Sequence, residues 1–163
     1  MFRSHLTPRF CTAVIASLCH FAAMAQAAPD SPNIHMIYMG GSDCPPCVGW
    51  RTFELPKLKK TAVFTTIRFT MIEKTIQSPV PPTFFLPEDV KPYKRKLDEA
   101  SSRLGGSSQI AIMVNGEVFD YYFGSERSAD DVERMLIAIK TGTKYPFERC
   151  IKAASFWSCA VKG

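Results

Sequence analysis

Histidine is scarce in this sequence, and its charges nearly balance. The 163 residues include three histidines, of which only His35 lies beyond the first twenty positions. Twenty lysines and arginines against fifteen aspartates and glutamates leave a formal charge of +5, and the basic residues are scattered along the chain. A weak and scattered positive charge argues against nucleic acid as a partner. The sequence also shows no internal repeat and no low-complexity segment.

No apolar run is long enough to span a membrane comfortably. The most apolar stretch, residues 10–24, follows a basic start and is interrupted by Ser17 and His20. The small residues Ala25-Gln26-Ala27 come next and form a cleavage signature. This order predicts a secretory signal peptide over residues 1–27, and therefore a periplasmic or secreted protein without a stable membrane anchor. A retained anchor is the alternative, and cleavage after Ala25 competes with cleavage after Ala27.

Cleavage would leave a chain of a size typical of one domain. Loss of Arg3 and Arg9 lowers the formal charge from +5 to +3, since 18 basic and 15 acidic residues remain. We expect a flexible leader over residues 28–33, one domain over residues 34–141, and a C-terminal extension packed on it over residues 142–163. The densest basic cluster is either a solvated helix face or a functional basic patch; it consists of Lys91, Lys94, Arg95 and Lys96.

Four cysteines remain after cleavage: Cys44, Cys47, Cys150 and Cys159. An even number in an exported chain favours disulfide chemistry over free thiols. We expect a structural disulfide between Cys150 and Cys159 that pins the C-terminal tail. A relay of electrons from this pair to Cys44 and Cys47 is the alternative.

The pattern of apolar residues predicts an α/β chain. A short apolar run over residues 34–39 indicates a buried strand. Ser42 or Asp43 can then cap a helix that holds Cys44 in its first turn and that Pro56 bends or ends. The later elements expected are a strand over 62–72, a helix over 88–104, a hairpin of strands 110–114 and 117–123 around Asn115-Gly116, and a helix with a capping box at Ser128 and Asp131.

A proline-rich loop separates the second strand from the second helix. Residues 77–83 contain three prolines and cannot form a central strand or a helix interior. Phe84-Phe85-Leu86, which follow, are compatible with a short edge segment. The insertion from Pro79 to Leu86 is either a rigid connector or a surface that binds a partner or covers the cysteine motif.

With these elements the chain resembles the thioredoxin-like superfamily. A buried strand leads into Cys-x-x-Cys at a helix start, and a hairpin with Asn115-Gly116-Glu117 precedes a closing helix. Trp50 and Leu55-Pro56-Lys57 are similar to the motif region of exported thiol-disulfide oxidoreductases. The resemblance covers roughly residues 34–141. It implies a central four-stranded mixed sheet flanked by helices, without the extra N-terminal strand and helix of longer members.

The resemblance and the helix start together assign roles to the two cysteines. Cys44 would lie at the positive end of a helix dipole, which stabilises its thiolate, and would be the nucleophile. Cys47, which should be less exposed, would be the resolving thiol. Pro45 and Pro46 supply no cation to the thiolate, so a reducing pair is favoured over an oxidising one. The expected partners are exported proteins with cysteines or disulfides and one redox partner; we expect a monomer with no cofactor and no metal.

Two departures from the superfamily pattern qualify this assignment. The position of its cis-proline falls on Ser108, within a loop whose substrate-docking residues would be Ser107, Ser108 and Gln109. Because a cis bond is costly without proline, we expect Ser108 to follow a trans bond. Tyr38 stands six residues before Cys44, where many thioredoxins keep a buried carboxylate that moves a proton from the resolving thiol.

Three other interpretations of the motif remain. Zinc would need the four thiolates of the mature chain, but the eight residues between the last two do not form a typical knuckle. Copper delivery would use His35, Met36 and Met39, although methionine on a strand is usually part of the core. The third is a permanent Cys44–Cys47 bridge in a non-catalytic binding or accessory protein.

Overall fold

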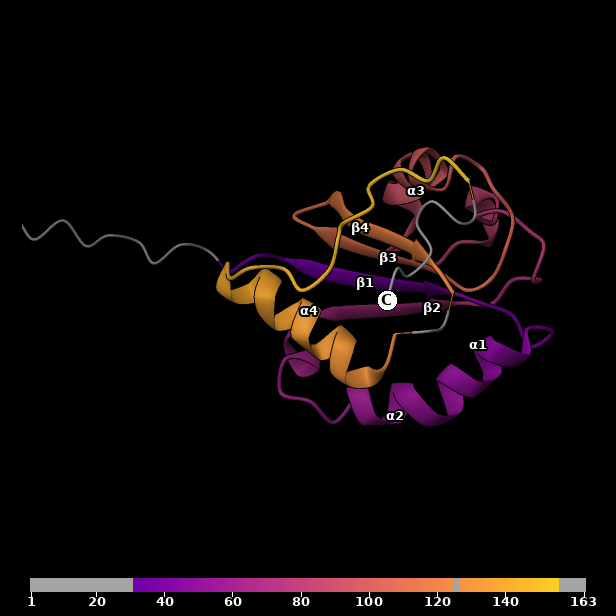
Figure 1. Ribbon diagram of the computed structural model, residues 1–163. Helices are drawn as coiled ribbons and strands as arrows, with labels where there is room; N and C mark the ends of the chain where they lie inside the picture. The colour runs from indigo at the N-terminus through magenta and orange to yellow at the C-terminus, as the bar shows by residue number, and fades with distance from the viewer. Residues whose placement is uncertain (1–30, 125–126, 156–163) are drawn as a thin grey trace, which may run out of the picture. The chain divides into compact units, whose positions relative to one another are not determined.

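The strand that precedes the cysteine motif runs through the middle of a mixed sheet. β1 (Ile34–Met39) pairs in parallel with β2 (Arg68–Ile72) and antiparallel with β3 (Gln109–Val114). β3 pairs antiparallel with β4 (Glu117–Phe123), so the strand order is β2-β1-β3-β4 (Figure 1). Every residue of β1 is buried, as expected of a strand covered on both faces. The predicted α/β class and four-stranded mixed sheet are confirmed.

This computed structural model describes residues 31–124 and 127–155. The predicted signal peptide, residues 1–27, lies outside the described residues, as do Cys159 and the rest of the segment 156–163. The described residues all belong to one compact unit, which the sheet organises. None of the helices in these two ranges is both long and apolar enough to cross a bilayer.

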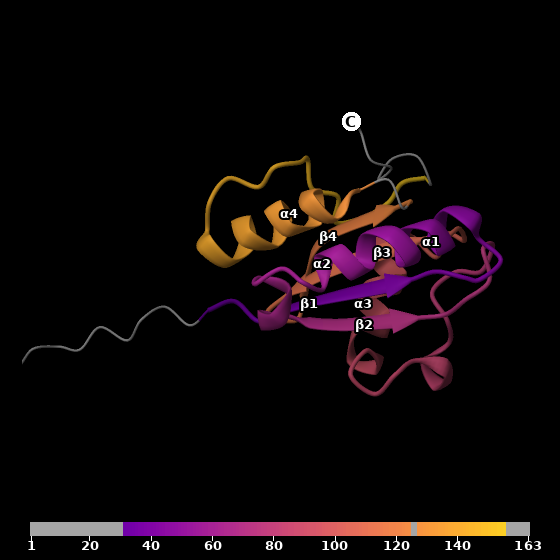
Figure 2. The same ribbon diagram turned by 90° about the horizontal axis from the view of Figure 1, so that it is seen from below.

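Helices cover both faces of the sheet. α1 (Pro45–Gly49), α2 (Leu55–Leu58) and α4 (Ala129–Thr141) lie on one face, and α3 (Lys94–Ser101) lies on the other (Figures 1 and 2). Side chains of β1 alternate between two cores, as the pleat requires. Met36 and Tyr38 pack in the core with both motif cysteines, whereas Ile37 and Met39 pack with α3.

The local signals with the clearest physical basis are confirmed. Asn115 and Gly116 both have positive φ, 52° and 82°, which the two-residue hairpin requires. Ser128 and Asp131 form the reciprocal capping box at the start of α4. Gly142 ends this helix with φ 68° in the left-handed region, where glycine has no steric cost.

The second strand is shorter than its composition suggested. The expected strand over 62–72 is wrong before Arg68, because the 3₁₀ helix Phe64–Thr66 occupies part of this stretch. Threonine hydroxyls explain the difference. Thr65 donates to the carbonyl of Ala62 and Thr66 to that of Val63, at 2.8 and 2.7 Å. Such local bonds give the backbone an alternative to the sheet ladder.

The predicted helix over 88–104 is also too long. The 3₁₀ turn Lys91–Tyr93 precedes α3, because Pro92 has no amide to donate to an α-helical bond. At the other end Ser102 and Arg103 have φ of 52° and 58°, which stops the helix after Ser101. The expected edge segment at Phe84 is wrong as well, since residues Thr83–Phe85 form a 3₁₀ turn.

Candidate functional site

The disulfide motif begins at the carboxyl end of the central strand β1. Gly40 continues the strand pairing through its amide, which donates to the carbonyl of Ile72 at 3.0 Å. A Cβ at Gly41 would lie 2.1 Å from the Asp43 Oδ1 atom and 2.3 Å from the carbonyl oxygen of Lys74. Only glycine therefore fits where the chain turns from the strand toward the cysteines.

Cys44 and Cys47 form a disulfide with a Cα–Cα distance of 5.2 Å. Cys44 is itself the N-cap of α1, and its sulfur accepts the amide of Cys47 at 3.3 Å. The predicted cap at Ser42 or Asp43 is wrong. Pro45 and Pro46 occupy the first two helical positions and have no amide, so the first amide that needs an acceptor is three residues after Cys44.

The helix that follows the motif contains a π-helical turn, Trp50–Glu54, between α1 and α2. The amide of Leu55 donates to the carbonyl of Trp50, five residues back. Pro56 explains this register, because its ring would clash with the carbonyl four residues before it and it has no amide of its own. Pro56 therefore neither ends nor breaks the helix, which continues to Leu58.

Both sulfur-bearing residues are buried in the oxidised state. Cys44 is 1 % exposed and Cys47 is 0 % exposed. Cys47 was expected from the sequence to be less exposed than Cys44, but the difference in exposure is negligible. In this state solvent therefore reaches almost none of the surface of either cysteine.

The rings of Tyr38 and Trp50 stack on each other next to the cysteine motif. Their rings are parallel within 8°, with centroids 4.9 Å apart, and the Tyr38 hydroxyl donates to the carbonyl of Cys47 at 3.3 Å. The position expected to hold a carboxylate thus carries a phenol that is fully buried and bonded to the backbone of the motif. This ring pairing was not predicted from the sequence, where the available signal was one large aromatic residue on each side of the motif.

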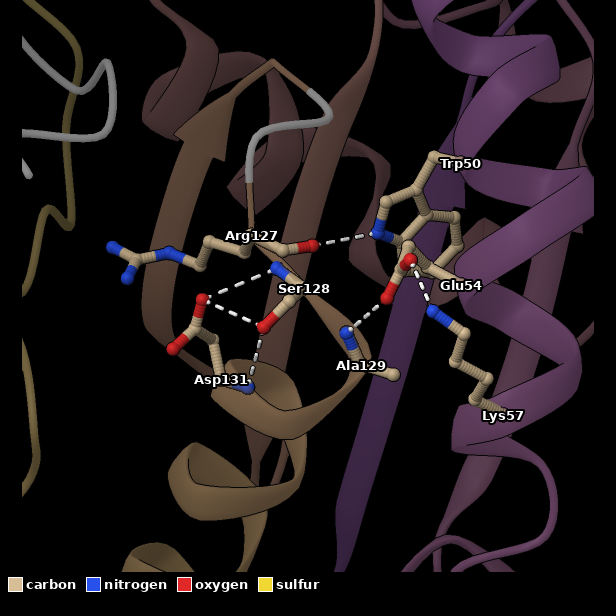
Figure 3. A network of polar contacts seen from close by, with 7 residues as sticks. All are labelled: Trp50, Glu54, Lys57, Arg127, Ser128, Ala129 and Asp131. Carbon is tan, nitrogen blue, oxygen red and sulfur yellow. Dashed lines mark hydrogen bonds and ion pairs between the residues drawn. The ribbon is translucent and has the colours of Figure 1, made fainter.

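A polar network joins the motif helix to the loop before α4 (Figure 3). The Trp50 indole donates to the carbonyl of Arg127 at 2.8 Å, and Glu54 accepts the amide of Ala129 at 2.8 Å. Glu54 also bonds Lys57, and this bond, followed by that to Ala129, lowers its pKa. The helical segment that follows the motif and the start of α4 are therefore fixed against each other.

The candidate docking loop leads into β3 at the end of the sheet where β1 leads into the cysteine motif. Gln109 begins β3 and pairs with Met39, the last residue of β1. The Ser107–Ser108 peptide bond is cis, so the expected trans bond is wrong. That expectation considered only the local preference of the bond, whereas tertiary bonds fix this loop. Ser108 accepts the amide of Gly124 at 2.8 Å, and Gln109 bonds Leu104, Gly106 and Tyr121.

Lys74 ties a third loop to the same end of the sheet, a role that was not predicted from the sequence. Its ammonium donates to the carbonyls of Ser78 and Gly106, and only 7 % of the residue is exposed. Burial lowers its pKa to about 8, although the nearby charge of Asp43 opposes the shift. A single lysine after a strand gives no sequence signal for such a role.

A cavity of about 360 Å³ lies between these loops. Its lining residues are Ile76, Gln77, Gly105, Gly106 and Ser107. The amide of Ile76 donates to Asp43, the residue before Cys44, at 3.0 Å. The cavity is therefore lined by Ser107 of the candidate docking loop and by Ile76, whose amide joins this segment to the residue before Cys44.

Cys150 packs against the core on the α3 side of the sheet. Cys150 is disulfide-bonded and packs on the α3 side, while its predicted partner Cys159 lies outside the described residues. Its amide donates to Asp120 at 2.8 Å and its carbonyl accepts from Tyr121 at 2.6 Å. The sheet separates Cys150 from the motif pair, so the described residues do not bring these three cysteines together; Cys159, on which the zinc site and the relay also depend, lies outside them.

The residues considered for copper are also separated. Met36 points into the core of the motif, whereas Met39 packs on the α3 side. The His35 ring bonds Thr70 at 2.9 Å and lies 3.5 Å from Asp89, and burial lowers its pKa. Within residues 31–124 and 127–155, no group of three or more histidine, cysteine or acidic residues is placed to hold a metal ion.

Comparison with known proteins identifies no relative. No protein-family model, curated protein or solved structure matches this chain. The function must therefore be inferred from the chemistry of the site. Its central features are the Cys44–Cys47 disulfide, the loop of Ser107 and Ser108, and the cavity that Ser107 lines together with Ile76.

Proposed function

We propose that this protein is a thioredoxin-like thiol-disulfide oxidoreductase that acts on other exported proteins. The observation that carries the proposal is the Cys44–Cys47 disulfide at the start of a helix that follows the central strand. The Cys44 sulfur already accepts the Cys47 amide at 3.3 Å. After reduction the same amide would stabilise a thiolate at Cys44, because an anion is a stronger acceptor than a disulfide sulfur.

The reaction has two balanced steps. The Cys44 thiolate attacks one sulfur of a substrate disulfide, forms a mixed disulfide and releases the other substrate sulfur as a thiolate. The Cys47 thiolate then attacks the Cys44 sulfur and releases the second substrate sulfur. The substrate gains two electrons and two protons, and Cys44–Cys47 becomes the disulfide. An exported redox partner with a dithiol would return the two electrons.

The arrangement of the elements supports the thioredoxin-like part of the proposal. The central strand, the parallel neighbour β2 and the β3–β4 hairpin follow the expected order, and α4 closes the face that holds the cysteines. The loop at Ser107 and Ser108, which leads into β3 beside the end of β1, would dock substrate through its backbone as the equivalent loop does in the superfamily. The cavity between Ile76 and Ser107 would accept an apolar side chain beside the scissile disulfide of the substrate.

We infer a reducing direction, as the motif suggested. Pro45 and Pro46 are exposed and place no cation between the two cysteines. Stabilisation of the Cys44 thiolate then depends on one amide and on the positive N-terminal end of the helix dipole. This favours a less oxidising pair. A periplasmic or secreted location would expose this pair to disulfides of other proteins.

Burial favours a second candidate, a binding or accessory protein in which Cys44–Cys47 is only structural. Both residues are at most 1 % exposed, and Tyr38 stands where a proton-accepting carboxylate would assist Cys47. In this case the disulfide would stabilise the turn between β1 and the motif helix. Its reduction potential would then lie below about −300 mV, as for structural disulfides, whereas a catalytic pair lies higher.

Insulin reduction with dithiothreitol tests the proposal. The wild-type protein should accelerate precipitation of insulin chains, and Cys44→Ser should abolish this acceleration. Cys47→Ser should instead accumulate a mixed disulfide that is detectable by mass spectrometry, because the resolving thiol is missing. The matched control is Ser42→Ala, an exposed residue just before the motif. Equal turnover by wild type and Cys44→Ser would remove the assignment.

A further inference from the structure

Two phenylalanines project from the proline-rich insertion. Phe84 is 77 % exposed and Phe85 is 66 % exposed, and their ring centroids are 4.0 Å apart. The segment is anchored on either side by buried Val80 and Leu86. The amide of Phe85 donates to the carbonyl of Pro82 at 2.9 Å, so the turn is fixed. The rings are therefore held in solvent by a rigid base.

Next to this turn lies a cavity of about 610 Å³ that is rich in positive charge. Its ionised lining side chains are five cations and two carboxylates, a net charge of +3: Lys91, Lys94, Arg95, Arg103 and Lys152 against Asp98 and Glu99. Thr83, the residue before Phe84, lines the same cavity. We refer to the cavity and the two phenylalanines together as the α3 surface.

Some of these cations are paired within the protein and others are available. Lys94 pairs with Asp98, Arg95 with Glu99, and Lys91 with Glu88, which does not line the cavity; the partners are three or four residues apart. Within the described part of the chain, the side chains of Arg103 and Lys152 have no hydrogen-bond or ion-pair partner. The cavity therefore presents two uncompensated positive charges beside two exposed aromatic rings.

Backbone hydrogen bonds hold the two segments that carry these cations. Arg103 has a left-handed φ of 58°, and its amide donates to the carbonyl of Asp98 at 3.0 Å. The segment that carries Lys152 is fixed by Ala153, whose amide donates to the carbonyl of Ala100 at 2.7 Å. Ser102 donates to the carbonyl of Ala153 from the end of α3. Two segments distant in sequence thus supply charge to one site.

We propose that the α3 surface docks the protein on a bilayer that contains anionic phospholipid. Phe84 and Phe85 would enter the boundary between headgroups and acyl chains, and Arg103 and Lys152 would bind lipid phosphates. The combination of apolar rings with a cationic rim is typical of peripheral membrane attachment. The rings protrude, so a protein partner would need a matching pocket, whereas a bilayer accepts them without a shaped complement.

The α3 surface and the disulfide lie on opposite faces of the sheet. α3 packs in the core of Ile37 and Met39, and the disulfide packs in the core of Met36 and Tyr38 (Figures 1 and 2). A protein attached through α3 would leave the motif face directed away from the bilayer. Membrane docking is therefore independent of the proposed redox activity and can be tested without it.

Sedimentation with lipid vesicles tests the docking. The secreted protein should bind vesicles of phosphatidylglycerol and phosphatidylcholine at low salt, and it should bind pure phosphatidylcholine at least tenfold more weakly. The double variants Phe84→Ser/Phe85→Ser and Arg103→Gln/Lys152→Gln should each lower partitioning by roughly tenfold or more. The matched controls are Phe53→Ser, which removes a ring that is 67 % exposed, and Lys60→Gln, which removes an exposed cation; both should bind like wild type.

Three results would overturn the proposal. The first is absence of binding to anionic vesicles. The second is equal loss of binding in the control variants, because the contact would then be a general charge or aromatic effect. The third is preference for a soluble probe, either glycerol 3-phosphate as a free headgroup or polyglutamate as an acidic protein chain, over the vesicles. Circular dichroism of each variant separates loss of binding from loss of fold.

Discussion

The ring of Tyr38 lies parallel to the indole of Trp50, 4.9 Å away, under the backbone of the motif. The first residue comes from the central strand and the second from the helix that the motif begins. Their polar groups point to different partners, because Tyr38 bonds the carbonyl of Cys47 and Trp50 bonds that of Arg127. The pair therefore fixes the disulfide helix to the sheet and also to the loop before α4.

The Trp50–Arg127 bond should contribute measurably to stability. Trp50→Phe keeps most of the aromatic surface but leaves the carbonyl of Arg127 without the indole donor. We expect the free energy of unfolding to fall by about 1–3 kcal/mol, measured by urea denaturation. Phe53→Leu, at an exposed position on the same turn, should change it by less than about 0.5 kcal/mol. Equal effects of the two substitutions would contradict the role of this bond.

Cys44 should ionise more readily than an ordinary cysteine once the disulfide is reduced. Its sulfur accepts the Cys47 amide at the helix start, and this favours the thiolate. The rate of alkylation by iodoacetamide in Cys47→Ser should therefore rise with a midpoint below about pH 8.5, the value for free cysteine. Urea-unfolded protein supplies the reference midpoint. A folded midpoint at or above that reference would show that the helix start does not activate the thiol.

Lys74 should make stability rise with pH in the alkaline range. Its pKa is about 8 in the folded protein against an ordinary value of 10.5, so the unfolded chain binds more protons between these two values. The charged form opposes folding, and the penalty is complete below about pH 8 and decreases as pH rises toward about 10.5. The gain should be roughly 2–3 kcal/mol by urea denaturation. Lys74→Met should remove this slope, and a slope retained in that variant would contradict the assignment.

Asp120 should have the opposite effect in the acidic range. Burial raises its pKa, although Cys150 and Tyr145 donate to its carboxylate. Its protonated form is favoured by folding, so its contribution is complete below the ordinary pKa and is lost as pH rises through the folded value. Asp120→Asn keeps an acceptor for the Cys150 amide and should abolish this dependence. Asp120→Ala should cost a further 1–3 kcal/mol or so, because the amides of Cys150 and Tyr121 and the hydroxyl of Tyr145 lose this acceptor.

Ile76 should influence substrate binding more than the chemical step. It lines the cavity beside Ser107, and its amide is bonded to Asp43. Ile76→Ser keeps this backbone bond but removes apolar surface from the cavity. In insulin reduction we expect KM to rise about three- to tenfold with kcat nearly unchanged, as for loss of one apolar contact. A fall in kcat at constant KM would show instead that the residue acts on the disulfide itself.

Elements with a strong local cause could be predicted from the sequence. The buried strand before the motif, the Asn115-Gly116 hairpin and the capping box at Ser128 all depend on residues within a few positions of each other. The same holds for the Cys44–Cys47 disulfide, since two intervening residues bring the cysteines together at a helix start. The prediction of a strand before Arg68 was wrong, because the threonine hydroxyls there bond the local backbone in place of a strand ladder.

The sequence by itself determined the order of strands and helices, the partner of each motif cysteine and the presence of prolines where helical amides are absent. Only the tertiary structure decided how deeply Cys44 is buried, that the Ser107–Ser108 bond is cis, and that Lys74 and Arg127 bond to distant segments. The physical reason is that strand, turn and cap preferences arise within a few residues. Burial, loop conformation and the environment of a charge depend on segments that are brought together only when the sheet is assembled.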